Sequence, residues 1–374
     1  MSRDALEVRG RARALLEIDL DAVVANWRML RDCARPAEVA AVVKADAYGL
    51  GAEPVARALW DAGCRRLFVA RLEEGIALRR LLPEADILVL DGVGRGESEA
   101  FLAGRLVPVL NHPGELALWR QVARRVERRL PCALHVDTGM TRLGFTAAEL
   151  EAAAAEGMAE LRPLLVMSHL ACADEPDHPL NAEQLARFRS LARVLPEVPR
   201  SLAASSGIFL GEAYRFDLCR PGVALYGVNP TPDRPNPMQP VVRLTAPILR
   251  VFALEEAASV GYGATYRAPA GARIATVPVG YADGLLRSLS GRGVARINGI
   301  PVPYAGRVSM DLIGLDVSRV PERLLAPGTE AELIGGPDGV DELARLAGTI
   351  GYELLTRLGR RLCRRYRREG MRRP

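Results

Sequence analysis

Residues 39–62 read VAAVVKADAYGLGAEPVARALWDA, and this stretch contains the unit from which much of the chain is built. Five apolar residues lead up to a lysine, a pattern typical of a buried β-strand. A turn with two glycines follows, and residues 53–62 then carry apolar side chains at helical spacing. The stretch therefore predicts a strand, a turn and a helix, with Lys44 at the carboxyl end of the strand.

The same unit recurs along residues 39 to 225. The expected strands lie at 39–44, 66–70, 86–90, 106–110, 132–137, 163–169, 199–203 and 216–219. The expected helices lie at 53–62, 72–82, 113–129, 147–157 and 181–195. Eight such units indicate an α/β fold of the (β/α)8 TIM barrel type, and the first strand lacks the G-x-G-x-x-G motif of an open dinucleotide-binding sheet.

In a barrel of this type, the carboxyl ends of the strands face the active site. Lys44, Asp137, His169 and Arg220 all fall at such ends. We therefore expect these four side chains to contribute to one site.

The pattern changes after the proline-rich linker at residues 230–237. β-prone runs at 241–252, 273–279, 294–297 and 311–315 alternate with glycine- and proline-containing turns, and a helix is expected around 341–357. We predict a barrel domain at 12–238 and a smaller, mostly β domain at 239–374. The segment at 14–20 is strand-like, and residues 12–20 are candidates to pair with the second domain.

Lys44 is the only lysine among 50 basic residues, and all the others are arginine. Arginine can replace lysine in a surface ion pair, but its guanidinium stays protonated and cannot form an imine. A buried ε-amine can lose its proton and attack an aldehyde, as lysines do with pyridoxal phosphate. The alternative is a lysine that survived by chance on a solvated face. The apolar run that ends at a glycine-containing turn favours imine chemistry.

The composition, with 49% apolar and 25% charged residues, is that of an ordinary globular protein. No apolar stretch reaches the roughly 18 residues that cross a bilayer, and the first residues lack the apolar core of a signal peptide.

Six scattered cysteines without a C-x-x-C motif fit reduced thiols in a cytoplasm. Four histidines without H-E-x-x-H spacing predict no metal centre. The net charge of +5 owes much to arginines after residue 359 and has no interleaved aromatic residues, so no nucleic-acid partner is expected.

Seven motifs occur in order: AVVKADAYG (41–49), DTGMTRLG (137–144), SHL (168–170), RPGVALYG (220–227), GYGATY (261–266), GYADG (280–284) and GRVSMD (306–311). Together they resemble the alanine racemases, over nearly the whole chain. The resemblance implies a pyridoxal 5'-phosphate-dependent isomerase that interconverts L- and D-alanine and supplies D-alanine for peptidoglycan. It also implies a cytoplasmic homodimer with shared active sites.

The resemblance assigns two bases. Lys44 would hold the cofactor as an imine and then act on one face of the substrate. Racemisation removes the α-proton from one face and returns a proton to the other, so a second base is required. The resemblance gives this role to Tyr262 of the partner subunit, whose Gly-Tyr-Gly setting favours an exposed hydroxyl. The alternative is a half-buried strand tyrosine. Since an ordinary tyrosine has a pKa near ~10, a basic Tyr262 needs nearby positive charge or donors.

The resemblance also assigns residues around the cofactor ring. Arg220 would face the pyridine nitrogen, where a donor-only guanidinium cannot supply a proton as an acid would. The ring then becomes a weaker electron sink, which favours reprotonation over side reactions. His169 resembles the residue that orients this arginine, and a satisfied core histidine is the alternative.

The phosphate requires amide and hydroxyl donors. Ser205, the amides of Gly222 and Val223, and the hydroxyls of Tyr48 and Tyr352 suit this role. For Ser205 alone, the alternative is a plain helix cap. Ala204 stands where the family often has asparagine, so one polar contact is missing here.

Arg142 resembles the arginine near the ring hydroxyl and the substrate carboxylate. The family often positions it with a carbamylated lysine seven residues upstream, where this chain has His135. Histidine cannot form that carbamate, so the negative charge is absent or an anion such as chloride replaces it. His135 can also be a barrel-lining residue with no role.

For substrate binding, the Met310 amide would hold the carboxylate, Asp311 would shape its turn, and Tyr281 would narrow the entrance. The rival functions are a broader-specificity or serine racemase, a non-catalytic pyridoxal-phosphate-binding protein and a decarboxylase of the same architecture. A non-catalytic single barrel would lack the second domain and Tyr262. A decarboxylase would place an acid at the ring nitrogen instead of Arg220.

Overall fold

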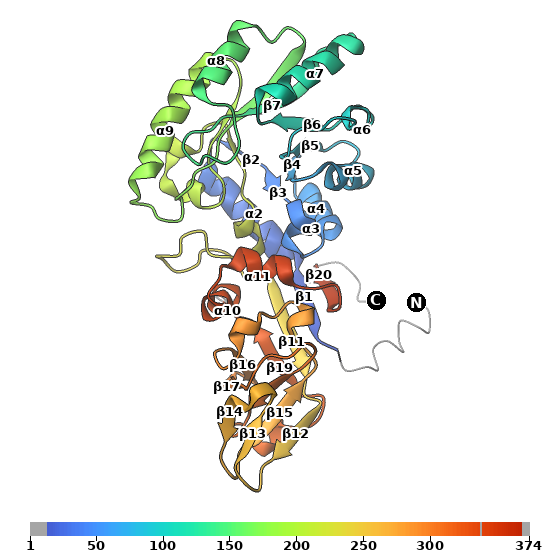
Figure 1. Ribbon diagram of the computed structural model, residues 1–374, viewed down its shortest axis with the longest axis vertical. Helices are drawn as coiled ribbons and strands as arrows, with labels where there is room; N and C mark the ends of the chain where they lie inside the picture. The colour runs from blue at the N-terminus through green and yellow to red at the C-terminus, as the bar shows by residue number, and fades with distance from the viewer. Residues whose placement is uncertain (1–12, 337–338, 369–374) are drawn as a thin grey trace. The chain divides into compact units, whose positions relative to one another are not determined.

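The protein is described by a computed structural model of residues 13–336 and 339–368. The chain divides into two compact units (Figure 1). The barrel unit comprises Val23–Leu225 and Asn229–Pro237, and the β unit comprises the described residues up to Ala22, Tyr226–Val228 and those from Met238 onward. Residue 12, where the barrel domain is expected to begin, and the arginines after residue 368 lie outside the described ranges.

A parallel sheet of seven strands runs through the described part of the barrel unit in sequence order. Its strands are β3 (Ala41–Val42), β4 (Arg66–Val69), β5 (Asp86–Val89), β6 (Val107–Leu110), β7 (Leu130–His135), β8 (Leu161–Met167) and β9 (Arg200–Ser201). A second parallel pair, β10 (Leu218–Cys219) with β2 (Glu38–Val39), joins the two ends of this sheet. The Arg220 amide donates to the Ala203 carbonyl at 2.9 Å, and the Val42 amide donates to the Pro221 carbonyl at 2.9 Å. The sheet is thereby closed, and the predicted (β/α)8 barrel is confirmed.

The helices that follow the strands start where local capping chemistry allows. They are α4 (Ala52–Asp61), α5 (Leu72–Leu81), α7 (Pro113–Arg125), α8 (Ala147–Ala155) and α9 (Pro179–Leu191), all close to the expected ranges (Figure 1). Thr146 begins α8, because its Oγ1 accepts from the Glu149 amide at 3.3 Å. None of the helices in the described ranges is long and apolar enough to cross a bilayer.

Two helices were not predicted, namely α2 (Leu20–Ala34) and α6 (Ser98–Ala103). α2 starts directly after a strand, and the Asp19 carboxylate caps it by accepting from the Ala22 amide at 3.0 Å. The Asp19 cap was the sequence signal for this helix, but it was overlooked because residues 14–20 were assigned to a strand. α6 spans only six residues and is too short to show a clear period.

The segment that carries the lysine is a left-handed turn. α3 (Lys44–Tyr48) is not a right-handed helix, because Ala45, Asp46, Ala47 and Tyr48 have φ between +52° and +56°. Gly49 follows at φ +84°. For residues other than glycine this conformation costs roughly 1–2 kcal/mol each, so four in a row need support from surrounding contacts.

The sheet of the β unit contains nine strands within the described residues, in the order β12-β15-β18-β17-β16-β19-β11-β1-β20. The strands are β1 (Leu15–Asp19), β11 (Val242–Pro247), β12 (Arg250–Ala253), β15 (Arg273–Val277), β16 (Val294–Ile297), β17 (Ile300–Ala305), β18 (Ile313–Asp316), β19 (Glu330–Ile334) and β20 (Cys363–Arg367). β1 pairs antiparallel with β11 and parallel with β20, so the N-terminal strand belongs to this sheet. The hairpin of β13 (Ala258–Val260) and β14 (Tyr266–Ala268) carries the Gly-Tyr-Gly turn.

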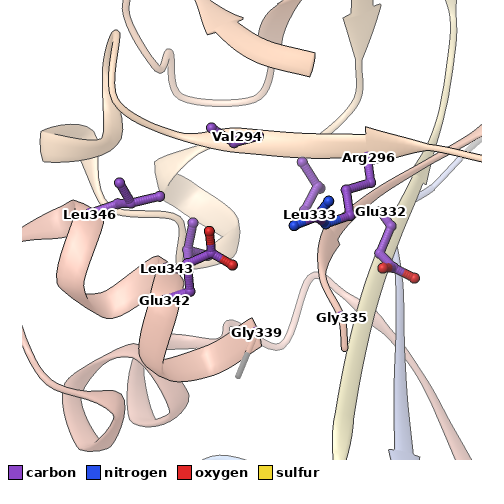
Figure 2. A pocket seen from close by; sticks show the side chains of 9 residues that line it. All are labelled: Val294, Arg296, Glu332, Leu333, Gly335, Gly339, Glu342, Leu343 and Leu346. Carbon is purple, nitrogen blue, oxygen red and sulfur yellow. The ribbon is translucent and has the colours of Figure 1, made fainter. Parts of the chain in front are cut away.

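Two predicted elements of the β unit are each divided. The run at 241–252 forms β11 and β12, and the helix expected at 341–357 forms α10 (Gly339–Ala347) and α11 (Gly351–Arg357). Gly348 separates these helices with φ +73°, a conformation that ends a right-handed helix. α10 covers β16 and β19 over a hollow of ≈ 20 Å³ lined by Leu333, Leu343 and Leu346 among others (Figure 2). This hollow has room for about one water molecule and is too small for a ligand.

Candidate active site

Lys44 stands two residues after β3, at the carboxyl end of the barrel, and its side chain is half-buried. Burial is the largest cause that lowers the pKa of its ε-amine, and the charge of Arg142 lowers this pKa further. Asp91 and Glu74 oppose the shift with their negative charges. A lowered pKa leaves a larger fraction of the amine unprotonated near neutral pH. Lys44 is thus prepared for nucleophilic attack.

Arg220 follows β10 directly and is a buried cation. Its Nη1 donates to the Ser201 hydroxyl, and its Nη2 donates to the Ser168 carbonyl at 2.6 Å. The Ser201 hydroxyl itself donates to the Leu218 carbonyl at 2.5 Å, which turns its lone pairs toward the guanidinium. Burial lowers the pKa of Arg220 to about 10. No carboxylate pairs with Arg220 among the described residues, so dipoles alone stabilise this charge.

A chain of buried side chains extends from this arginine to α9. Gln184 donates from Nε2 to the Thr138 hydroxyl at 3.1 Å and accepts at Oε1 from the Ala171 amide at 2.8 Å. Thr138 and Ser168 share a hydrogen bond of 2.8 Å between their hydroxyls. This set and Ser201 were not predicted from the sequence. Thr138 and Ser168 lie inside the quoted motifs, but nothing in the helix around Gln184 indicates its role.

His169 lies two residues after β8, half-buried beside this network. Burial, together with the charges of Arg220 and Arg142, lowers its pKa to about 3, so its imidazole is neutral at physiological pH. Within the part of the chain that the structure describes, no hydrogen bond joins the imidazole to Arg220. Ser201 and the Ser168 carbonyl hold the guanidinium.

Asp137 shapes the loop that presents Arg142. Its Oδ1 accepts from the amides of Gly139, Met140 and Thr141 at 3.0, 3.0 and 3.1 Å. Burial raises the pKa of this carboxyl, but the three amide hydrogen bonds outweigh burial and hold it below its ordinary value. The Arg142 side chain is exposed, and no hydrogen bond or ion pair constrains it within the described residues. Arg142 is therefore available for an anionic ligand.

His135 ends β7 and faces Asn111. Asn111 donates from Nδ2 to the carbonyls of Leu90 and Val109 at 3.1 and 2.8 Å, so its Oδ1 must face the His135 Nδ1, 2.9 Å away. His135 therefore carries its proton on Nδ1 and a lone pair on Nε2. Burial and the charges of Arg220 and Arg142 lower its pKa to about 4. A neutral imidazole thus occupies the position where the resemblance implies a carbamate.

Four of the five residues expected at the phosphate, namely Tyr48, Ser205, Gly222 and Val223, lie in the barrel unit. The Ser205 Oγ accepts from the amides of Gly222 and Ala224 at 3.1 and 3.2 Å. A Cβ on Gly222 would lie 2.2 Å from the Tyr48 hydroxyl oxygen, so only glycine lets Tyr48 approach this closely. The Gly222 amide itself donates to Ser205. The Val223 amide has no protein acceptor within the described ranges.

This group of residues fits pyridoxal phosphate in three ways. A half-buried lysine with a lowered pKa suits an aldehyde. Hydroxyls and an unused amide, at Tyr48, Ser205 and Val223, suit a phosphate. Buried Arg220 offers a donor to a ring nitrogen and no acid.

The β unit holds the remaining expected residues. Tyr262 begins the turn Tyr262–Ala264 with 73% of its surface exposed, beside a hollow of ≈ 590 Å³ that it lines with Phe252, Arg307 and others. The sequence-based expectation of an exposed tyrosine is correct. Tyr352 lies on α11 with 41% of its surface exposed.

Tyr281 and Met310 lie side by side on two loops of the β unit. The Tyr281 amide donates to the Ser309 carbonyl and the Ala282 amide to the Met310 carbonyl, both at 3.0 Å. Arg361 fastens the same loops by contacting Asp283 at 3.2 Å and Asp311 at 2.7 Å. The Met310 amide has no protein acceptor in the described ranges, so it is free to bind a carboxylate.

Comparison with known proteins agrees with this arrangement. The family model for the alanine racemase N-terminal domain matches residues 18–230, and that for the C-terminal domain matches residues 241–366. The alanine racemase of Rhodospirillum rubrum is 53% identical over 95% of this chain and 96% of its own length. A catabolic alanine racemase of Agrobacterium fabrum is 47% identical over 98% and 95%, and a biosynthetic one from the same organism is 45% identical over 94% and 93%.

Solved structures show the same likeness. The alanine racemase of Bartonella henselae, with covalently bound pyridoxal phosphate, superposes with a TM-score of 0.91 at 37% identity, covering 95% of this chain and 100% of that one. The biosynthetic alanine racemase of Pseudomonas aeruginosa superposes with a TM-score of 0.88 at 37% identity, covering 96% and 100%. Both family domains and the order of the motifs lead to one conclusion: the chain belongs to the alanine racemase family.

Proposed function

We propose that the protein is an alanine racemase that uses pyridoxal 5'-phosphate and interconverts L- and D-alanine. The observation that carries this proposal is the single lysine of the chain, half-buried with a lowered pKa at the carboxyl end of a (β/α)8 barrel. When bound, the cofactor supplies an electron sink that stabilises the carbanion formed by loss of the substrate α-proton. The barrel and the β unit supply the groups that bind substrate and move this proton.

Lys44 is proposed as the covalent anchor and as the base on one face of the substrate. Tyr262 of the partner subunit is proposed as the base on the other face, in a homodimer with shared active sites. Its high exposure supports this role, because a base that serves a second copy of the chain must project from its own. General acid–base groups of this kind contribute about 10²–10⁴-fold to a rate.

Around the cofactor, Tyr48, Ser205 and the Val223 amide are proposed to bind the phosphate, with Tyr352 as a further donor. Gly222 contributes the space that Tyr48 needs and orients Ser205. Arg220 is proposed to donate to the ring nitrogen, with His169 as a neutral ring nearby. Because Arg220 supplies no acid, it would leave the ring nitrogen unprotonated, which would favour racemisation over transamination.

For the substrate, Arg142 and the Met310 amide are proposed to bind the carboxylate, and Tyr281 to limit the side chain to a methyl group. The neutral His135 leaves Arg142 without a fixed anionic partner, and Arg142 forms no ion pair with any described residue, which supports this reading. A chloride between the two residues would complete the charge balance. We further propose that the enzyme works in the cytoplasm and supplies D-alanine for peptidoglycan.

The test is a racemisation assay of the purified protein on L-alanine, L-serine and longer L-amino acids. Highest kcat/KM on alanine supports the proposal. Similar values on alanine and on longer side chains would indicate the alternative, a broader-specificity racemase of the same fold. Cofactor binding without racemisation of any of them would indicate a non-catalytic binding protein. Deletion of the gene should create a need for D-alanine, and growth without D-alanine would contradict the biosynthetic role.

A further inference from the structure

The left-handed turn that carries Lys44 needs external support. Within the turn, the Ala47 amide donates to the Val43 carbonyl at 2.9 Å, the Gly49 amide to the Ala45 carbonyl at 2.8 Å and the Gly51 amide to the Asp46 carbonyl at 2.8 Å. Downstream, the Asp46 carboxylate accepts from the Ala52 amide at 2.7 Å and so fastens the turn to the start of α4. The upstream end, directly after the lysine, is fastened by a residue from another element.

That residue is Glu74, in the first turn of α5. Its Oε1 accepts from the Ala45 amide at 2.6 Å, across 29 positions of sequence. Its Oε2 accepts from the amides of Ala70 and Arg71 at 2.8 and 3.1 Å and so caps α5. A cap alone uses only one oxygen. The second oxygen is committed to the peptide that joins Lys44 to Ala45.

We propose that Glu74 is the positioning residue for Lys44, because its carboxylate ties the left-handed turn to the first turn of α5 and thereby holds the ε-amine at the carboxyl end of the barrel. Capping α5 and binding the Ala45 amide together need two acceptor oxygens, which only a carboxylate offers. Glutamine in its place presents an NH₂ group to one of the two sets of amides, and two donors then face each other. The inference rests on the proposed function only in that Lys44 is the reactive lysine.

If Glu74 positions Lys44, its replacement should raise the pKa of Lys44. If Glu74 acts only through its charge, its replacement should lower that pKa. Burial is the largest influence that lowers the pKa of Lys44, whereas the charge of Glu74 raises that pKa by a smaller effect. If the turn relaxes, the Lys44 amine becomes more exposed to solvent, and its pKa rises toward the ordinary value of ~10.4. If Glu74 acts only through its charge, its removal lowers the pKa of Lys44.

Because Lys44 is the only lysine of the chain, its pKa can be measured on the full-length, cofactor-free protein. Acetic anhydride in limiting amount modifies unprotonated amines, and mass spectrometry of the peptide with Lys44 gives the midpoint of its pH dependence. Glu74→Gln should raise this midpoint relative to the parent protein, by roughly one unit, so that about tenfold less amine is unprotonated at neutral pH. Glu74→Asp, which keeps the charge but shortens the reach, should raise it as well. Glu73→Gln removes the neighbouring exposed charge of the same turn and should leave the midpoint unchanged.

A midpoint that falls or stays constant in Glu74→Gln and Glu74→Asp would overturn the proposal. Circular dichroism checks that each variant is folded, and unfolding of both Glu74 variants would also overturn it, since Glu74 would then support the whole fold. Because labelling needs no cofactor, a parent protein that fails to racemise alanine would refute the proposed function and leave this result intact.

Discussion

Acidification from pH 8 to pH 5 should destabilise the barrel unit through two histidines. His135 and His169 have pKa values of about 4 and about 3 in the folded protein, below the ordinary value of 6.5. A base with a depressed pKa stays neutral in the fold while the unfolded chain takes up a proton, so stability falls as the pH drops below 6.5. From these values, each histidine costs about 2 kcal/mol at pH 5, and the two together cost about 4 kcal/mol. Glu115 opposes this change, because burial raises its pKa and the folded state binds its proton first.

The assay is urea unfolding of the cofactor-free protein, followed by tryptophan fluorescence at pH 8 and pH 5. Trp27, Trp60 and Trp119 are the three tryptophans of the chain and all belong to the barrel unit, so the signal reports on that unit alone. His135→Gln and His169→Gln should each reduce the loss between the two pH values by about half. A loss below about 1 kcal/mol, or one that neither core substitution alters, would refute the reasoning.

Three further predictions concern the cofactor site. Gly222→Ala places a Cβ 2.2 Å from the Tyr48 hydroxyl oxygen and should weaken pyridoxal phosphate binding about tenfold or more, as measured by fluorescence titration, and unchanged affinity would contradict the crowding. Ser201→Ala removes an acceptor from buried Arg220 and should destabilise the barrel unit by about 1.5–3 kcal/mol, whereas Ser206→Ala should not. Arg220→Glu should lower the racemisation rate and raise pyruvate formation from alanine, and unchanged kinetics would refute the role given to Arg220.

Much of the barrel could be predicted from the sequence because buried parallel strands appear as short apolar runs. Residues 66–70 and 86–90 became β4 and β5 almost unchanged, and Leu67, Phe68 and Val69 are fully buried. Residues at strand ends were also predictable, since the barrel topology brings Lys44 and Arg220 to the same edge. The predicted element boundaries were wrong where a single residue ends an element, as Gly348 does between α10 and α11.

The left-handed turn and the polar network could not be predicted for a different reason. Gly49 signals a positive φ, but Ala45, Asp46 and Ala47 carry no such signal, and the carboxylates of Glu74 and Asp46 hold the turn through the amides of Ala45 and Ala52. Ser201 likewise shows no local pattern, and its role depends on Arg220, which lies 19 residues away in sequence. Such contacts are set by tertiary structure, while short-range patterns report only on local structure.

The most direct test of the central claim is the covalent bond between Lys44 and the cofactor. The purified protein is loaded with pyridoxal phosphate, reduced with borohydride and digested. The mass of the peptide that contains Lys44 is then measured by mass spectrometry. The account predicts that this peptide carries one phosphopyridoxyl group and that Lys44→Met abolishes both the adduct and racemisation. An unmodified Lys44 peptide, or full turnover by Lys44→Met, would contradict the account.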